Sequence, residues 1–115
     1  MCALKAAIYL SLLGKNGLKK LALLNLENAS ETHARLLQIP GVRAFSKKSF
    51  FNEFVLWIDK DPDKLKESLS RHKILGPLSL DRFYPELRRA YLFAVTENRV
   101  ASDLARLEQA ISETK

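Results

Sequence analysis

The sequence of 115 residues is poor in cysteine, histidine and glycine, and each scarcity excludes a class of site. Its one cysteine, Cys2, allows no internal disulfide and no cysteine-based zinc cluster. The two histidines, His33 and His72, lie far apart in the sequence, and neither has an obvious carboxylate partner. The four glycines form no phosphate-binding loop and no nucleophile elbow. The common catalytic and metal motifs are therefore missing.

A long hydrophobic run is missing as well. The most apolar stretch, residues 3–13, includes Lys5 and is shorter than the roughly 20 residues that a membrane-spanning helix needs. No positive charge precedes this stretch and no small-residue cleavage site follows it, so it does not read as a signal peptide. We predict a buried helix here and a cytoplasmic protein, since a single cysteine is typical of a reducing compartment.

The charge is plentiful and predominantly positive. A net charge of +6 and a pI near 9.6 invite a nucleic-acid interpretation. The lysines and arginines are, however, spread over the whole chain and mostly interleaved with acids, as in KDPDKLKE. Nucleic-acid modules more often gather their basic residues on one face among aromatics. The pattern favours scattered, solvated charge, with a nucleic-acid footprint as the alternative.

The apolar pattern predicts one domain that begins with two helices. Residues 3–13 are apolar on nearly every side, a break follows at residues 14–17, and a second helix runs over residues 18–38. We expect His33 at a partly buried packing seam of this second helix, whose apolar stripe comprises Ala22, Leu26, Ala29, His33, Leu36 and Leu37. A first helix that is apolar all round needs cover on every face. Such cover would come from a partner chain or from the rest of a longer protein.

The remainder alternates strands and helices. Strands are predicted at residues 42–45, 50–58 and 91–96, and helices at residues 62–72, with Asp61 as the N-cap, and 102–112. The most economical packing of this order is an α/β fold of the α+β type. It has a small, three-stranded, mainly antiparallel sheet with helices packed on one face.

Two places carry candidate site residues. The connection over residues 73–89 is long for a small domain, which is typical of functional or interface segments, and it contains Phe83 and Tyr84. The strand that follows ends in Thr96, Glu97, Asn98 and Arg99, and an arginine there could hold a carboxylate or phosphate. The structural alternative is that Thr96 and Asn98 cap the next helix while Glu97 and Arg99 pair with neighbours.

Five segments, in register over essentially the whole chain, resemble one family. They are AAIYLSLLGKNGLKKLALLNLENA, IPGV, FFNEFVLWI, ILGPLSLDRFYPEL and AVTENR. The resemblance is to the C-terminal part of the glycine decarboxylase (P-protein) of the glycine cleavage system, in subunit 1 of its two-subunit bacterial form. That family belongs to the pyridoxal-phosphate enzymes of fold type I, the aspartate-aminotransferase-like group. Its small C-terminal domain has a three-stranded antiparallel sheet with helices on one side, which agrees with the pattern above.

The resemblance implies an oxidoreductase, glycine dehydrogenase (aminomethyl-transferring). The reaction decarboxylates glycine and transfers the aminomethyl group to a lipoyl carrier protein. The cofactor, pyridoxal phosphate, would be bound through a lysine of subunit 2, so we assign no catalytic, cofactor-binding or metal-binding residue here and expect this fragment alone to be inactive. The expected partners are subunit 2 and the lipoyl carrier protein, with no nucleic acid and no membrane.

The resemblance also implies that residues 1–115 are a single C-terminal domain cut from a longer subunit. Residues 1–38 would be junction helices and residues 39–115 the sheet-and-helix core. The segments FNEF, FYPEL and TENR recur in the family, so we expect candidate contacts at the domain junction or the subunit interface from Asn52, Glu53, Tyr84, Glu97 and Arg99.

One residue departs from the family pattern. Val100 stands where relatives often have a threonine, which would cap the last helix, so we expect the cap at Asn98 or Ser102. Two other functions remain open at this point. One is a free-standing basic α/β module that binds nucleic acid or a protein partner, and the other is a different fold type I enzyme with the same small domain.

Overall fold

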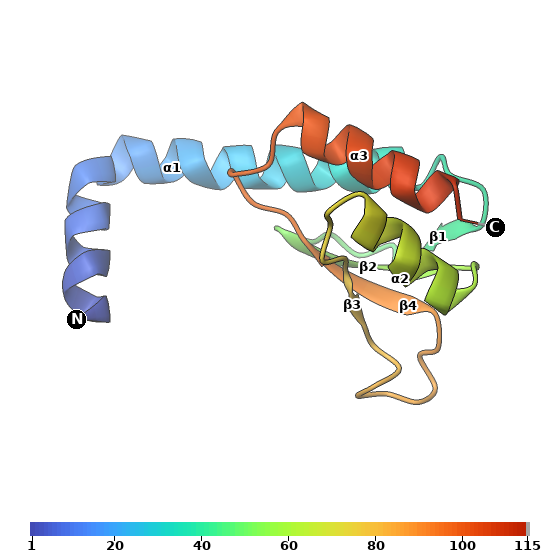
Figure 1. The fold of residues 1–115 in the computed structure, drawn as a ribbon. Coiled ribbons are helices and arrows are strands. Elements are labelled where there is room, and N and C mark those ends of the chain that lie inside the picture. The colour runs from blue at the N-terminus through green and yellow to red at the C-terminus, as the bar shows by residue number, and fades with distance from the viewer. Residues whose placement is uncertain (115) are drawn as a thin grey trace.

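A computed structural model of the chain describes residues 1–114, which form three helices and four strands. Figure 1 shows how these elements are arranged. In chain order, the elements are α1 (Cys2–Leu36), β1 (Val42–Ala44), β2 (Glu53–Ile58), α2 (Pro62–Arg71), β3 (Leu78–Ser79), β4 (Ala90–Ala94) and α3 (Ala101–Ser112). The mixed helix-and-strand class that the sequence predicts is confirmed.

The four strands form one antiparallel sheet in the order β1-β2-β4-β3. The central pair joins Phe54 to Phe93 and Leu56 to Tyr91, and the Phe54 and Phe93 rings stack with centroids 5.4 Å apart. The predicted count of three strands is too low by one, because β3 has only two residues. A strand this short shows no alternating pattern in the sequence.

The helices α2 and α3 cover one face of the sheet (Figure 1). That face buries alternate residues of β2, namely Phe54, Leu56 and Ile58, as expected for period-two side chains. The helices contribute the buried residues Leu65, Leu69, Leu104 and Ile111. Ser68 of α2 donates to the Ala110 carbonyl of α3 over 2.8 Å, so the two helices are joined by a buried hydrogen bond as well as by apolar packing.

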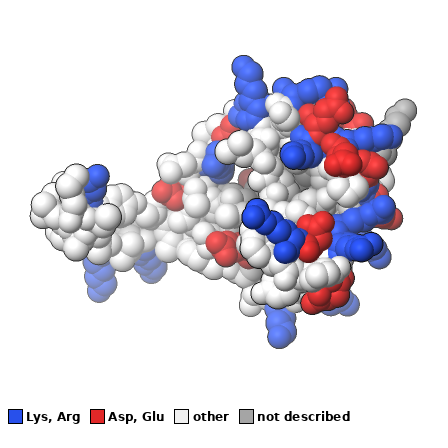
Figure 2. All heavy atoms as spheres, turned by 60° about the horizontal axis from the view of Figure 1, so that its bottom comes forward, with Lys and Arg blue, Asp and Glu red and all other residues white. Residues whose placement is uncertain are grey.

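Helix α1 has two parts with different surroundings. Its last turns pack into the core through Ala29, Thr32 and Leu36, and Arg35 forms an ion pair with Glu108 of α3. The preceding residues 1–26, which we call the arm, project away from the sheet (Figures 1 and 2). The predicted break is confirmed as a kink at Gly14, whose φ of 59° and ψ of −176° suit glycine alone.

The arm is apolar and uncovered. Ten large hydrophobic residues of residues 1–26 are exposed, namely Met1, Leu4, Ile8, Tyr9, Leu10, Leu12, Leu18, Leu23, Leu24 and Leu26. The prediction that residues 3–13 form a buried helix is thus wrong for this chain, since all of them except the half-buried Leu13 are exposed. The expectation that this helix lacks its cover matches the structure. No helix of residues 1–114 is long and apolar enough to cross a membrane.

Two predicted element starts are wrong. Strand β2 begins at Glu53 rather than at residue 50, because Phe50 leaves the strand line and packs against His33 of α1, with ring centroids 4.9 Å apart. Helix α3 has Val100 as its N-cap rather than Asn98 or Ser102. Valine offers no side-chain acceptor, and the Val100 N–H instead donates to Asp103 Oδ2 over 3.3 Å.

Candidate functional site

Four of the five predicted contact residues lie at one end of the sheet. Asn52 and Glu53 precede and begin β2, and Glu97 and Arg99 follow β4. Antiparallel pairing brings these ends together, since Glu53 pairs with Ala94 and the Val95 N–H donates to the Asn52 carbonyl over 2.9 Å. The fifth residue, Tyr84, is in the loop between β3 and β4, at the opposite end of the sheet.

Helix α1 adds residues to this end that sequence reasoning missed. Asn28 Nδ2 donates to the Thr96 carbonyl over 3.2 Å, which fastens the β4–α3 loop to α1. Asn25, almost one turn earlier, has a buried side-chain oxygen with no hydrogen-bond partner among residues 1–114. The Asn28–Thr96 contact spans 68 positions, and the burial of Asn25 depends on the helix packing, so no local pattern could have revealed either feature.

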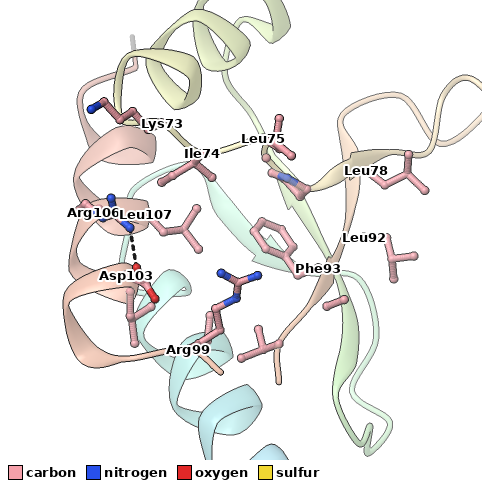
Figure 3. Close-up of a pocket in the computed structure, with 16 residues that line it drawn as sticks. Lys73, Ile74, Leu75, Leu78, Leu92, Phe93, Arg99, Asp103, Arg106 and Leu107 are labelled. Carbon is pink, nitrogen blue, oxygen red and sulfur yellow. Dashed lines mark hydrogen bonds and ion pairs between the residues drawn. The ribbon is translucent and has the colours of Figure 1, made fainter. Parts of the chain in front are cut away.

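The end of β4 opens into a hollow of about 570 Å³ (Figure 3). Its walls are the first half of α3, the connection from Lys73 to Pro77, and the last residues of β4, with Thr32 of α1 at one side. Phe93, Ile74, Leu104 and Leu107 give it an apolar floor. The hollow thus lies between α3 and the β4–β3 side of the sheet, where Leu78 also lines it.

Three cations and one acid line the hollow. Arg106 pairs with Asp103, which is marked in Figure 3, and this pair neutralises itself. The pKa of Asp103 is held below its usual range, mainly by the Val100 backbone N–H and then by Arg106, so the carboxylate stays charged. Arg99 points toward the Phe93 ring, whereas the ammonium group of Lys73 points away from the centre (Figure 3).

The structural alternative for the strand tip is wrong. Neither Thr96 nor Asn98 caps α3, and within residues 1–114 neither Glu97 nor Arg99 forms an ion pair. The Arg99 guanidinium is thus a free donor group beside an apolar floor. Such a group can bind a carboxylate or a phosphate with two parallel hydrogen bonds.

The two histidines have separate surroundings. His33 lies half-buried between the Phe50 and Phe54 rings, as expected for a packing seam, and this burial lowers its pKa from the usual 6.5. His72 was expected to lack a carboxylate partner, but its Nε2 lies 3.1 Å from Oε2 of Glu113, the C-cap residue of α3, 41 positions away in the chain. Residues 1–114 contain no cluster of three or more His, Cys, Asp and Glu side chains that could hold a metal ion.

Lysines able to carry an aldehyde cofactor are exposed rather than enclosed. Every lysine of residues 1–114 is exposed except Lys60, which is half-buried and donates to the Thr114 carbonyl. Lys73 lines the hollow beside Arg99, but its ammonium group points away from the centre (Figure 3). The residues described therefore do not fit a pyridoxal-phosphate site contained within this chain.

Comparison with known proteins identifies relatives over the whole chain, although no family model matches it. The chain is 44% identical over 115 residues to glycine dehydrogenase (decarboxylating) subunit 1 of Desulfitobacterium hafniense and covers 26% of that protein. It is 38% identical over 111 residues to the protein of the same name from Moorella thermoacetica and covers 25% of it. Thus the chain spans about a quarter of the length of the curated relatives it matches.

A solved structure has the same fold. It is a crystal structure of glycine decarboxylase (P-protein) of the glycine cleavage system in inhibitor-bound form. The similarity has a TM-score of 0.79 and 40% sequence identity, and it covers 93% of this chain and 24% of the other. Fold and sequence therefore agree on the same relatives.

Proposed function

We propose that this chain, which belongs to the family of glycine dehydrogenase (decarboxylating) subunit 1, is the C-terminal domain of a longer subunit and serves there as a structural, subunit-contacting part. The observation that carries this proposal is the exposed apolar arm. Ten large hydrophobic residues exposed within residues 1–26 exceed what a free-standing domain normally leaves in water. The rest of a subunit about four times as long would provide the cover.

The proposed organisation is a single domain over residues 1–115. Residues 1–38 are the junction helices and residues 39–115 the sheet-and-helix core, to which the last turns of α1 also contribute through Leu36. The proposed contacts fall into two groups. Asn52, Glu53, Glu97 and Arg99 lie at the end of the sheet from which the arm projects, while Tyr84 would reach a second surface from the opposite end.

The proposed activity of the parent is the decarboxylation of glycine, which the names of the relatives support. The finer parts of the proposal rest on the family resemblance. They are pyridoxal phosphate as the cofactor, subunit 2 and the lipoyl carrier protein as partners, and a cytoplasmic location. The resemblance also implies that the cofactor lysine belongs to subunit 2, and the proposal therefore expects this chain alone to be inactive.

A free-standing basic module that binds nucleic acid is the weaker proposal. On the face seen in Figure 2, lysines and arginines of the sheet-and-helix part lie among aspartates and glutamates. A nucleic-acid site would gather its cations in one groove or stripe.

The test is reconstitution of the parent enzyme. Full-length subunit 1 is mixed with subunit 2, pyridoxal phosphate and lipoylated carrier protein, and the exchange of labelled carbon dioxide with the glycine carboxyl group is measured. We expect glycine-dependent exchange, its loss on deletion of this domain, and none from the isolated chain. The double variant K47E/K48E, in the exposed loop between β1 and β2, is the control that should keep full activity. Absence of exchange from the intact mixture, or full exchange without the domain, would overturn the proposal.

A further inference from the structure

We propose that the hollow beside Arg99 is the receptor for an acidic side chain carried on an apolar segment of the rest of the parent subunit. This inference rests on the proposed function for the source of the segment. The site itself is defined by the residues of this chain alone. Its chemistry therefore has a test that does not depend on glycine decarboxylation.

Arg99 supplies the recognition group. Its side chain is exposed, points into the hollow and has no ion pair within residues 1–114. The other guanidinium, that of Arg106, is already bound by Asp103. An unpaired guanidinium at the rim of an apolar cavity favours a carboxylate, because two parallel N–H donors match its two oxygens.

The charge of the lining selects an anion. Lys73, Arg99 and Arg106 against Asp103 leave a formal charge of +2. The lowered pKa of Asp103 keeps the Asp103–Arg106 pair ionised over the neutral range. Arg99 contributes a weaker electrostatic attraction to Asp103, but within residues 1–114 it forms no ion pair with it. A neutral or cationic group would leave the Arg99 donors without an acceptor.

The size and the apolar floor of the hollow indicate an occupant that is larger than a bare carboxylate. A volume of about 570 Å³ is that of a site for a small organic molecule or for several side chains. Phe93 and Leu104 are exposed by less than a tenth, and they form with Ile74 and Leu107 an apolar surface that a bare anion would leave wet. The occupant therefore combines a carboxylate with an apolar body.

The rest of the parent subunit is the source that the structure favours. About three quarters of the length of the relatives lies outside this chain. The hollow lies beside the part of α1 that follows the arm, because Thr32 of α1 lines it and Asn28 of α1 holds the β4–α3 loop that carries Arg99. A body that covers the exposed leucines up to Leu26 is thus in position to insert a segment beside Arg99.

The experiment uses 4-phenylbutyrate as a mimic of such a segment. Nuclear magnetic resonance shifts of the backbone amides of Val95, Arg99 and Leu104 in the 115-residue chain report its binding. We expect saturable binding at millimolar concentration, about tenfold weaker in the variant R99Q and little changed in R88Q, which removes the same charge from the far loop. R99K keeps the charge without the paired donors, so its affinity for 4-phenylbutyrate should lie between those of R99Q and the unchanged chain. Amide spectra of all variants verify that the fold is retained.

Two comparisons decide the result. Equal binding of the neutral 4-phenylbutyramide, or equal binding of the acid to R99Q and the unchanged chain, would overturn the carboxylate site. In the full-length parent, the proposal expects that 4-phenylbutyrate no longer binds, since the hollow is filled. Binding of the acid to the full-length protein with the same affinity would refute the internal occupant and indicate a site for a free organic acid. Either failure leaves the measurement of glycine exchange unaffected, so the two proposals can fail separately.

Discussion

At the scale of single residues, His33 predicts how stability depends on pH. Burial beside Phe50 and Phe54 lowers the pKa of His33 in the folded chain below its usual 6.5. Between these two pKa values the unfolded chain binds more protons than the folded one, so the free energy of unfolding decreases as the pH falls through this window. Above pH 7 this decrease in the free energy of unfolding is absent. Urea unfolding at pH 7.5 and at pH 5 should therefore show a smaller pH-dependent loss in H33Q than in the unchanged chain.

The matched control is H72Q, which removes the histidine beside Glu113 and keeps the seam. H72Q should retain the part of the pH dependence that is lost in H33Q. An H33Q variant with the same pH dependence as the unchanged chain would contradict the role given to the burial of His33.

The N-cap residue Asp61 allows a prediction about the stability of α2. Asp61 Oδ1 accepts hydrogen bonds from the backbone N–H groups of Asp63 and Lys64, each 3.0 Å long, at the start of α2. We expect D61A to reduce the free energy of unfolding by about 1 kcal/mol, because these N–H groups lose their acceptor. D61N keeps an acceptor oxygen and should lose much less. Equal losses in D61A and D61N, measured by urea denaturation, would show that the hydrogen bonds are not the cause.

These residues also show what sequence can predict. The Asp61 cap was predictable because its partners are two and three positions away and Pro62 marks the first turn. The cap of α3 was mispredicted because Val100 cannot accept a hydrogen bond, and the compensating group, Asp103, acts from inside the helix. The His72–Glu113 contact could not be predicted, since only the packing of α2 against α3 brings the two together.

At the scale of elements, the kink of α1 depends on one glycine. Gly14 has a backbone conformation that costs other residues about 1–3 kcal/mol, although no atom lies within 4 Å of the position a Cβ would take. Alanine also favours a helix over glycine by about 1 kcal/mol. G14A should therefore straighten α1, with more helix by circular dichroism and a longer maximum dimension by small-angle X-ray scattering. G17A, at a position already helical, should leave the kink in place.

The sheet shows which elements can be predicted from the sequence and which cannot. The central strands were predictable in place, because residues 54–58 and 90–95 are short apolar runs bounded by polar residues. Strand β3 depends on pairing with β4 at Leu78 and Ser79, and two residues are too few to show a strand pattern in the sequence. The candidate site was predictable as a strand tip but not as a hollow, since its floor combines Phe93 of β4 with residues of α3 and the long connection.

At the scale of the whole molecule, the chain consists of a packed body and an uncovered arm, and they should behave independently. The body holds every buried apolar residue of the core, the first of them Ala29, while the arm holds four lysines, no acid and ten exposed large hydrophobic residues. An apolar surface of this kind drives association in water. We predict that the chain self-associates with increasing concentration and that a chain lacking residues 1–26 is monomeric.

The shortened chain should retain nearly the full free energy of unfolding, because Ala29, Thr32 and Leu36 still close the core. Light scattering after gel filtration at several concentrations measures the association, and urea denaturation measures the stability. The full-length double variant L18E/L23E, which changes two exposed leucines of the arm, should reduce association while keeping the same stability. A full chain that stays monomeric would contradict the prediction that the exposed arm drives association. A shortened chain that no longer folds would show that the body needs contacts with the arm.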